Sequence, residues 1–231
     1  MRVPLTSYGL PQVAFWPCVT AIAMAGFSAA AYRSIPSWVV LTVDCLLAAI
    51  LVWMLSFFRD PDRSSPSGDD LLLSPADGKV TDVSVVENPE FTGGKALRIG
   101  IFLSIFNVHI NRSPCRARVD RIEYKPGKYR NALSPESSRV NESNYVYMTR
   151  LQSPGDPLIV RQVSGAIARR IVCKAIEGQI LYPGERFGMI KFGSRTELYL
   201  PSRTDVECLV KVGQPVRAGL TVLVRYQPCQ G

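Results

Sequence analysis

Two long apolar stretches near the N-terminus constrain the fold of this chain more than any other feature. Residues 13–32 carry no charged side chain before Arg33, and residues 38–58 carry only Asp44. A helix needs about 20 apolar residues to cross a hydrocarbon core of about 30 Å. The segment between the two stretches, RSIPS, is long enough only for a tight turn. We therefore predict that residues 1–58 form a helical hairpin that anchors the chain in a membrane.

The single acidic residue in the second stretch tests this prediction. A central Asp costs about 2.5–3.5 kcal/mol on insertion, and each Leu, Ile, Val or Phe returns about 0.3–0.6 kcal/mol. Residues 38–58 contain twelve residues of those four types, so insertion is favoured despite Asp44. Residues 13–32 contain only five, together with Pro17, and would span as half of a hairpin or lie in the interface. The alternative is a soluble hairpin that packs against a core.

The pattern changes after residue 58. Residues 59–70, RDPDRSSPSGDD, read as a polar linker, and residues 71–231 contain many short stretches in which apolar and polar residues alternate. No amphipathic helix of ordinary length interrupts them. We predict a mainly β domain, a sandwich or barrel-like structure, over residues 71–231. The candidate strands are residues 79–86, 96–103, 117–124, 145–151, 157–163, 168–175, 186–192, 196–201, 206–212 and 221–226.

The charge balance and the scarcity of metal ligands narrow the function. Lys and Arg outnumber Asp and Glu by 27 to 19, which suits either nucleic acid or an anionic membrane surface. The chain has no recognisable nucleic-acid motif, so we expect no nucleic-acid partner. Its six cysteines are scattered without a C-x-x-C pair and it has one histidine, so we expect no metal site.

Three residues of the β-rich region supply complementary chemistry. Ser194 follows Gly193 in KFGSRTE, where a Gly-Ser pair interrupts a strand-like run and, taken alone, reads as a hairpin turn. His109 is the single histidine, and Asp77 lies in SPADGKV, a turn before a strand. Together they offer a hydroxyl nucleophile, a base with a pKa near neutrality and a carboxylate that could orient that base.

The segments around these residues resemble a known family. SPADGKV (74–80), FLSIFNVHINRSP (102–114) and YPGERFGMIKFGSRTELYLP (182–201) resemble, in order and spacing, the short bacterial and archaeal form of phosphatidylserine decarboxylase. The resemblance extends over residues 70–228. It implies a carboxy-lyase that converts phosphatidylserine to phosphatidylethanolamine.

The resemblance also implies a covalent cofactor. In that family the chain cuts itself at a Gly-Ser bond, and the serine becomes an N-terminal pyruvoyl group whose carbonyl takes up the electrons released with CO₂. The matching bond here is Gly193–Ser194, which would leave chains 1–193 and 194–231 that stay together. The catalytic residues would be Ser194, His109 and Asp77. The family's usual Leu-Gly-Ser-Thr is Phe-Gly-Ser-Arg in this chain, which puts the role of the usual threonine in doubt.

Basic residues near the second block could bind the substrate. Arg112, Lys125, Lys128 and Arg130 could contact the lipid phosphate or an anionic bilayer, although each alone also fits a solvated basic surface. Lys125, Lys128 and Arg130 lie within residues 125–144, a connection without clean periodicity that is typical of a binding loop or of disorder.

Other interpretations remain open on these residues. The serine head group could belong to an archaeal-type ether lipid, or the chain could be a membrane-anchored serine hydrolase, although it lacks G-x-S-x-G. A third is a non-catalytic β module that adheres to lipid. We expect phosphatidylserine in an anionic membrane as the partner, with a homo-oligomer compatible with the sequence. A two-span hairpin would place the N-terminus and the catalytic domain on one side of the cell membrane, the cytoplasmic side.

Overall fold

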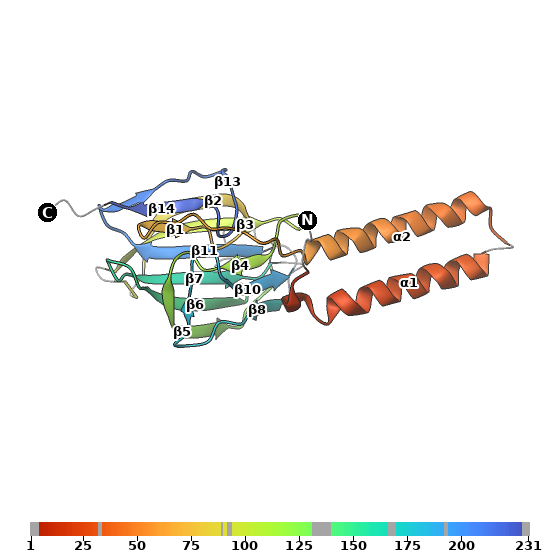
Figure 1. Ribbon diagram of the computed structural model, residues 1–231, viewed down its shortest axis with the longest axis horizontal. Helices are drawn as coiled ribbons and strands as arrows, with labels where there is room; N and C mark the ends of the chain where they lie inside the picture. Colours follow the sequence, from red (N-terminus) through yellow and green to blue (C-terminus); the bar gives the residue numbers. More distant parts are fainter. Residues whose placement is uncertain are drawn as a thin grey trace. The chain divides into compact units, whose positions relative to one another are not determined.

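The computed structural model describes most of the chain and divides it into two compact units. The units are Met1–Asp62 and Arg63–Gly231. The first is helical and the second is mainly β, as Figure 1 shows, which confirms the predicted fold class. The boundaries predicted at residues 58 and 70 stay a prediction. The described residues are 5–31, 34–88, 90–91, 94–130, 140–165, 170–191 and 194–227.

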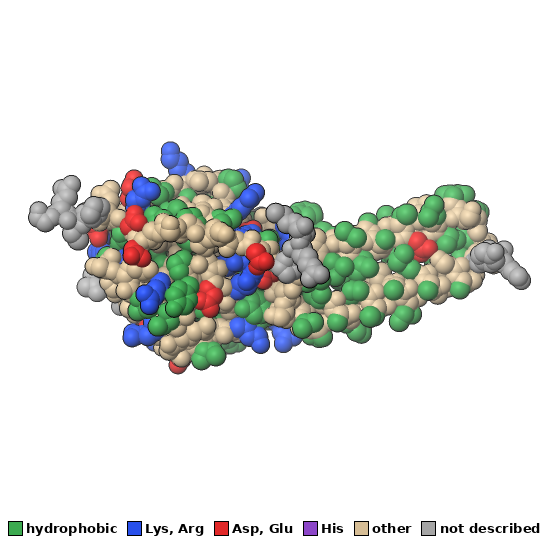
Figure 2. All heavy atoms as spheres, viewed as in Figure 1, with side chains coloured by type: hydrophobic (Ala, Val, Ile, Leu, Met, Phe, Trp, Pro, Cys, Tyr) green, Lys and Arg blue, Asp and Glu red, His purple; other side chains and the backbone are tan. Residues whose placement is uncertain are grey.

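The first unit contains a short 3-10 helix, η1 (Ser7–Gly9), and two long helices, α1 (Gln12–Ala31) and α2 (Ser37–Phe57). Both long helices are apolar and long enough to cross a membrane, and their apolar windows are not buried inside the protein. Hydrophobic side chains line their visible face in Figure 2, whereas charged side chains concentrate on the β-rich unit. The hydroxyl of Ser28 on α1 donates a hydrogen bond of 2.6 Å to Asp44 on α2, so a polar partner accompanies the one acidic residue.

An antiparallel sheet of eight strands dominates the second unit, in the order β13-β2-β3-β11-β7-β6-β5-β9. Two three-stranded sheets accompany it, β1-β14-β12 and β4-β10-β8. The strands are β1 (Leu71–Leu73), β2 (Gly78–Glu87), β3 (Lys95–Leu103), β4 (Ile110–Arg112), β5 (Ala117–Lys125), β6 (Ser143–Arg150), β7 (Pro157–Val163), β8 (Arg170–Cys173), β9 (Ile180–Leu181), β10 (Arg186–Lys191), β11 (Ser194–Pro201), β12 (Val206–Cys208), β13 (Pro215–Val216) and β14 (Val222–Tyr226).

Strand β11 illustrates how the alternating pattern produces two different faces of the large sheet. Leu198 and Leu200 are fully buried in the main hydrophobic core. Arg195, Glu197 and Tyr199 alternate with them and lie on the other face, where they bond to one another. The apolar positions therefore build the core, and the intervening positions build a polar lattice on the opposite face.

Irregularities in the ladders lie close to the region of functional interest. The pairing of β2 with β3 shifts register between Val80 and Asp82, which marks a β-bulge that bends the strand. The pairing of β10 with β4 shifts between Arg186 and Gly188. All ten predicted strands are confirmed in position, and four short strands, β1, β4, β9 and β13, were not predicted.

Candidate active site

Asp77, His109 and Ser194 come to the same end of the eight-stranded sheet. Strand β2 begins at Gly78, directly after Asp77. Strand β3 ends at Leu103, whose partner in the ladder is Ser194, the first residue of β11. Because β2, β3 and β11 are antiparallel neighbours, the start of β2, the end of β3 and the start of β11 lie at the same end of the sheet. His109 lies on the connection that leads from this end of β3 to β4.

The side chain of Ser194 is buried without a partner. Ser194 is 0% exposed, and its hydroxyl makes no hydrogen bond among the described residues. A buried polar group in this state costs about 1–3 kcal/mol, and the hydroxyl of Ser164 at the end of β7 is buried in the same way among the described residues. The predicted cleavage site also includes Gly193, which, with Phe192, lies outside the described residues. A serine whose hydroxyl is not committed to any neighbour fits a residue that is converted chemically.

The ring of His109 is fixed by a backbone carbonyl. His109 is fully buried, and its Nδ1 lies 2.9 Å from the carbonyl oxygen of Asn107. A carbonyl oxygen only accepts, so Nδ1 carries the hydrogen and, in the neutral ring, Nε2 carries the lone pair of a base. The side chain of Asn107 accepts hydrogen bonds from the amide and hydroxyl of Ser104, which fixes the turn. The carbonyl of His109 accepts from Ile190 on β10, four residues before Ser194.

Asp77 is held by an arginine that the sequence did not single out. Arg63 donates to both carboxylate oxygens, with Nη1–Oδ1 and Nη2–Oδ2 distances of 2.5 and 2.8 Å. The amide of Ala218 donates to the same Oδ1 at 2.8 Å. Both side chains of the ion pair are buried, so the fork of Arg63 fixes the carboxylate bidentately. The predicted orientation of His109 by Asp77 stays a prediction, since the partner at Nδ1 is the Asn107 carbonyl.

A fully buried asparagine links all three sequence blocks. The amide nitrogen of Asn111 donates to the carbonyl of Pro75 in the first block and to the hydroxyl of Thr196 in the third, at 3.3 and 3.0 Å. Its oxygen accepts from Gln162 on β7 at 2.9 Å, and Gln162 in turn accepts from Asn144 on β6. Buried networks of this kind rigidify a site. An asparagine two residues after the single histidine was the available signal, but nothing local showed that it would be buried.

The four basic residues predicted to bind substrate have different surroundings. Arg112 is buried and donates to the carbonyl of Gly184 at 3.0 Å. Lys125 is half-exposed, pairs with a neighbouring carboxylate and lies over an aromatic ring. Lys128 and Arg130 are exposed, and residues 131–139 of the following loop lie outside the described residues. Lys128 and Arg130 therefore lie on the surface of the β-rich unit.

A lysine lies close in the sequence to the predicted cleavage site at Gly193–Ser194. Lys191 ends β10, three residues before Ser194, and is 4% exposed. Burial lowers the pKa of Lys191, and the positive charge of Arg170, its ladder partner on β8, lowers that pKa further. The amine therefore loses its proton more readily than a lysine in water.

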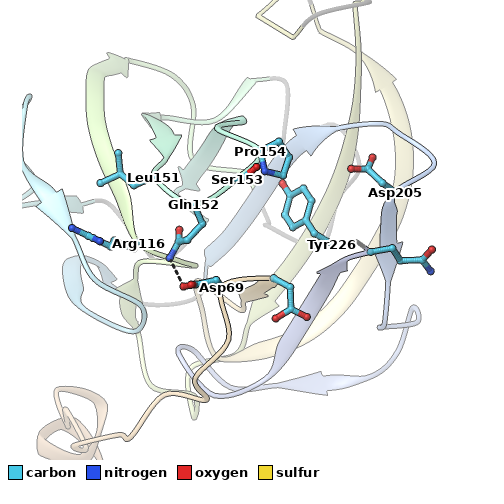
Figure 3. Close-up of a pocket in the computed structure, with 10 residues that line it drawn as sticks. Asp69, Arg116, Leu151, Gln152, Ser153, Pro154, Asp205 and Tyr226 are labelled. Carbon is cyan, nitrogen blue, oxygen red and sulfur yellow. Dashed lines mark hydrogen bonds between the residues drawn. The ribbon is translucent and has the colours of Figure 1, made fainter. Parts of the chain in front are cut away.

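A cavity lies at the opposite end of the sheet. It has a volume of about 720 Å³, and Figure 3 shows Tyr226 among its lining side chains. Ser153 and Pro154 contribute to its wall between the end of β6 and the start of β7. The length of β7 separates this turn from the end that pairs with Arg195, about 20 Å at the usual rise of a strand. None of the three predicted catalytic residues lines this cavity.

Metal-binding geometry is absent from the described part of the chain. No group of three or more His, Cys, Asp or Glu side chains there could hold a metal ion. Cys115 is buried, and burial raises the pKa of its thiol to about 12, which keeps it protonated and unreactive.

Comparison with known proteins identifies the family. The family model for phosphatidylserine decarboxylase matches residues 50–224. The chain belongs to the phosphatidylserine decarboxylase family. The match contains the three sequence blocks that converge at the Ser194 end of the sheet.

Curated members of the phosphatidylserine decarboxylase family align with most of the chain. A phosphatidylserine decarboxylase proenzyme of Rhodopirellula baltica is 45% identical over 190 residues, which cover 82% of this chain and 77% of the relative. The proenzyme of Pelagibacter ubique is 45% identical over 75% of this chain and 80% of its own length. The proenzyme of Desulfotalea psychrophila is 39% identical over 96% of both chains, so that alignment includes most of the helical unit.

Proposed function

We propose that this chain decarboxylates phosphatidylserine to phosphatidylethanolamine, with a pyruvoyl group made from Ser194 when the chain cuts its own Gly193–Ser194 bond. The observation that carries the proposal is the position of Ser194 where the three family blocks meet, with a buried hydroxyl that has no partner among the described residues. The relatives' description as proenzymes supports maturation by cleavage.

The self-cleavage uses atoms of the two residues at the bond. The hydroxyl oxygen of Ser194 attacks the carbonyl carbon of Gly193, and the C–N bond breaks to leave an ester and a free amine. A base removes the Cα proton of residue 194, the Cβ–O bond breaks, and the carboxylate of Gly193 leaves as a new C-terminus. The remaining dehydroalanine tautomerises, and water displaces its nitrogen as ammonia to leave the ketone.

His109 is the best base for this sequence. The hydrogen bond from Nδ1 to the Asn107 carbonyl leaves the lone pair on Nε2, the nitrogen that can take the Ser194 proton. We assign to Asp77, whose carboxylate Arg63 fixes at the same end of the sheet, the role of supporting this base. After maturation the same ring can return a proton to the Cα of the decarboxylated head group.

The pyruvoyl group supplies an electrophilic carbonyl that condenses with the substrate amine and accepts the electrons freed with CO₂. The protein's own part is to bind and orient the head group. Lys128 and Arg130 are exposed and suited to the lipid phosphate. The lowered pKa of Lys191 makes its amine a second group that can exchange a proton close to residue 194.

The architecture favours two chains that stay together after the cut. Strand β11 would belong to the small chain, yet it lies in the middle of the large sheet between β3 and β7, both in the large chain. Its residues pair with β3 from Ser194 to Pro201 and with β7 from Arg195 to Tyr199. Separation of the chains would expose this paired, buried strand to water.

The helical unit favours action at a membrane. Two apolar helices of spanning length suit an enzyme whose substrate is a bilayer lipid. We place the catalytic unit at the cytoplasmic face of the cell membrane, since a two-span hairpin returns the chain to the side on which it began.

A membrane-anchored serine hydrolase that uses Ser194 as its nucleophile is the second candidate. The uncommitted hydroxyl of Ser194 favours it equally, but a hydrolase keeps one intact chain. Decarboxylation of an ether-lipid serine head group would require the same site, and assays with ester and ether lipids separate the two substrates.

Maturation of the full-length chain tests the proposal. The wild-type protein should give two bands on denaturing electrophoresis. The intact mass of the small chain should match residues 194–231 with a pyruvoyl group in place of Ser194, so that both the amine and the hydroxyl of the serine are lost. Ser194→Ala should remain one chain with no decarboxylation, because no hydroxyl is left to attack. Ser202→Ala, an exposed serine on the same segment, is the matched control and should mature normally. Cleavage of Ser194→Ala, or an uncut active wild type, would refute self-processing.

A further inference from the structure

The arginine after Ser194 crosses the sheet to reach β2. Arg195 is 8% exposed, and its Nε donates to Oε1 of Glu197 at 2.7 Å. Its Nη1 donates to the hydroxyl of Thr81 at 3.0 Å, and its Nη2 bonds to the carboxylate of Asp82. One guanidinium therefore joins the start of β11 to a strand that is not its ladder neighbour.

The intervening strand is adapted to this crossing. Arg195 pairs with Phe102 of β3, and its guanidinium passes over Gly100 of the same strand. A Cβ at Gly100 would overlap both the guanidinium of Arg195 and the carboxylate of Asp82. The bulge of β2 falls between Val80 and Asp82. It therefore includes Thr81 and Asp82, the two residues to which the guanidinium of Arg195 bonds. A glycine and a bulge on two strands thus accommodate one side chain.

The carboxylate that anchors the crossing is committed on both oxygens. Glu197 is 0% exposed, with Oε1 bonded to Arg195 and Oε2 bonded to Arg161 at 3.2 Å and to the hydroxyl of Tyr199 at 2.6 Å. A buried carboxylate with three donors is held firmly, so it fixes the guanidinium of Arg195 in turn.

We propose that Arg195 is a positioning residue, whose guanidinium holds residue 194 in place for self-cleavage and holds the new chain end afterwards. The inference rests on the proposed function. After the cut, residue 194 would be the first residue of the small chain, and chain ends fray unless they are tied down. Thr81 and Asp82 lie in the large chain, so Arg195 would tie the second residue of the small chain across the cut.

Two other arginines in the lattice provide matched controls. Arg161 on β7 bonds to the same buried carboxylate of Glu197, and Arg98 on β3 bonds to the same carboxylate of Asp82 at 2.9 Å. Neither is adjacent to Ser194 in the chain. Arg161→Thr and Arg98→Thr therefore remove comparable ion pairs from the lattice while leaving Arg195 in place.

The test compares variants of the full-length protein by two readouts, the rate at which the two chains appear and the thermal unfolding midpoint. Arg195→Thr should slow cleavage about 10²-fold, since misplacement of a reacting group by about 1 Å costs that much. Arg161→Thr and Arg98→Thr should lower the unfolding midpoint to a similar degree and cleave within about threefold of wild type, because the backbone at residue 194 stays tied.

Arg195→Lys covers the possibility that the threonine variant fails to fold. Lysine keeps a positive charge beside Glu197 but loses the planar fork that reaches Thr81 and Asp82 together. It should fold, cleave more slowly than wild type and, once cut, release its small chain at lower denaturant concentration. Cleavage at the wild-type rate in both Arg195 variants, or equal slowing in Arg161→Thr, would overturn the inference alone. An uncut wild type would overturn the proposed function as well.

Discussion

The two ends of the eight-stranded sheet bury polar side chains in different ways. At the Ser194 end, both carboxylate oxygens of Glu197 and both ends of the Asn111 amide are hydrogen-bonded. At the opposite end, beside the cavity of about 720 Å³, the Nε of Arg150 and the hydroxyl of Tyr226 are buried and have no partner in the described part of the chain. Unbonded polar atoms occur at the Ser194 end as well, in Ser194 and Ser164, so the two ends differ in what surrounds these atoms: bonded side chains at one end and an open cavity at the other.

This difference shows why cavity size alone is a poor guide to the site. Arg150 is held at the cavity end by stacking 4.1 Å above the ring of Tyr226 and by bonds to backbone carbonyls, which are ordinary structural contacts. At the other end, the hydroxyls of Ser194 and Ser164 are both buried and have no partner among the described residues. Only Ser194 lies at the Gly-Ser bond of the third sequence block, so the sequence block, and not an unbonded hydroxyl by itself, marks Ser194.

Breaking the Asp77–Arg63 pair should separate chemistry from stability at the Ser194 end. Asp77→Asn and Arg63→Met each leave one buried charge without its partner, which should cost about 3–5 kcal/mol of unfolding free energy. Asp77→Asn should also abolish cleavage, because it removes the negative charge proposed to support His109. Arg63→Met keeps that charge and should cleave in its folded fraction. Electrophoresis after purification of folded protein measures the difference.

Equal cleavage by Asp77→Asn and Arg63→Met would contradict the role proposed for Asp77. If both remain uncut although folded, Asp77 acts through the bidentate pair as a structural group. If both are cut at the wild-type rate, Asp77 has no part in maturation.

His109→Gln should slow cleavage about 10²–10⁴-fold, the usual contribution of a positioned acid or base. Glutamine fills much of the same volume and can donate to the Asn107 carbonyl, but it has no basic nitrogen. Gln152→Ala is the contrasting variant and should cleave normally, since this residue lines the cavity at the opposite end of the sheet. Time courses of chain separation measure both. A His109→Gln protein that matures at the wild-type rate would exclude the imidazole as the base.

The fold was largely predictable because its elements carry strong periodic signals. The two apolar helices and the ten predicted strands follow from uninterrupted apolar runs and from alternation. Strand β4, Ile110–Arg112, is too short to show a period, and it directly follows the single histidine. Strands of two or three residues form because their neighbours present a free edge, which is information that a local pattern does not contain.

The candidate site was predictable in its members and less so in its contacts. Ser194, His109 and Asp77 were identified from their chemistry and from the family resemblance. Arg63 was not, because it lies in a linker-like segment and its bond to Asp77 spans 14 residues of chain. The partner of Arg195 on β2 is 113 residues away in the sequence. Contacts of this kind depend on strand order, which one sequence does not specify.

Two buried tyrosines differ in whether their hydroxyl is hydrogen-bonded among the described residues. Tyr199 donates a hydrogen bond of 2.6 Å to the buried carboxylate of Glu197, whereas the hydroxyl of Tyr226 has no partner among the described residues. Tyr199→Phe should therefore lower the free energy of unfolding by about 1.5–3 kcal/mol, the range for a hydrogen bond to a charged group. Tyr226→Phe should change it by less than about 0.5 kcal/mol, since no bond is lost and a buried hydroxyl is removed. Denaturant unfolding of the two variants, with equal slopes, gives both values. A loss at Tyr226 as large as that at Tyr199 would mean that the hydroxyl of Tyr226 is bonded in solution.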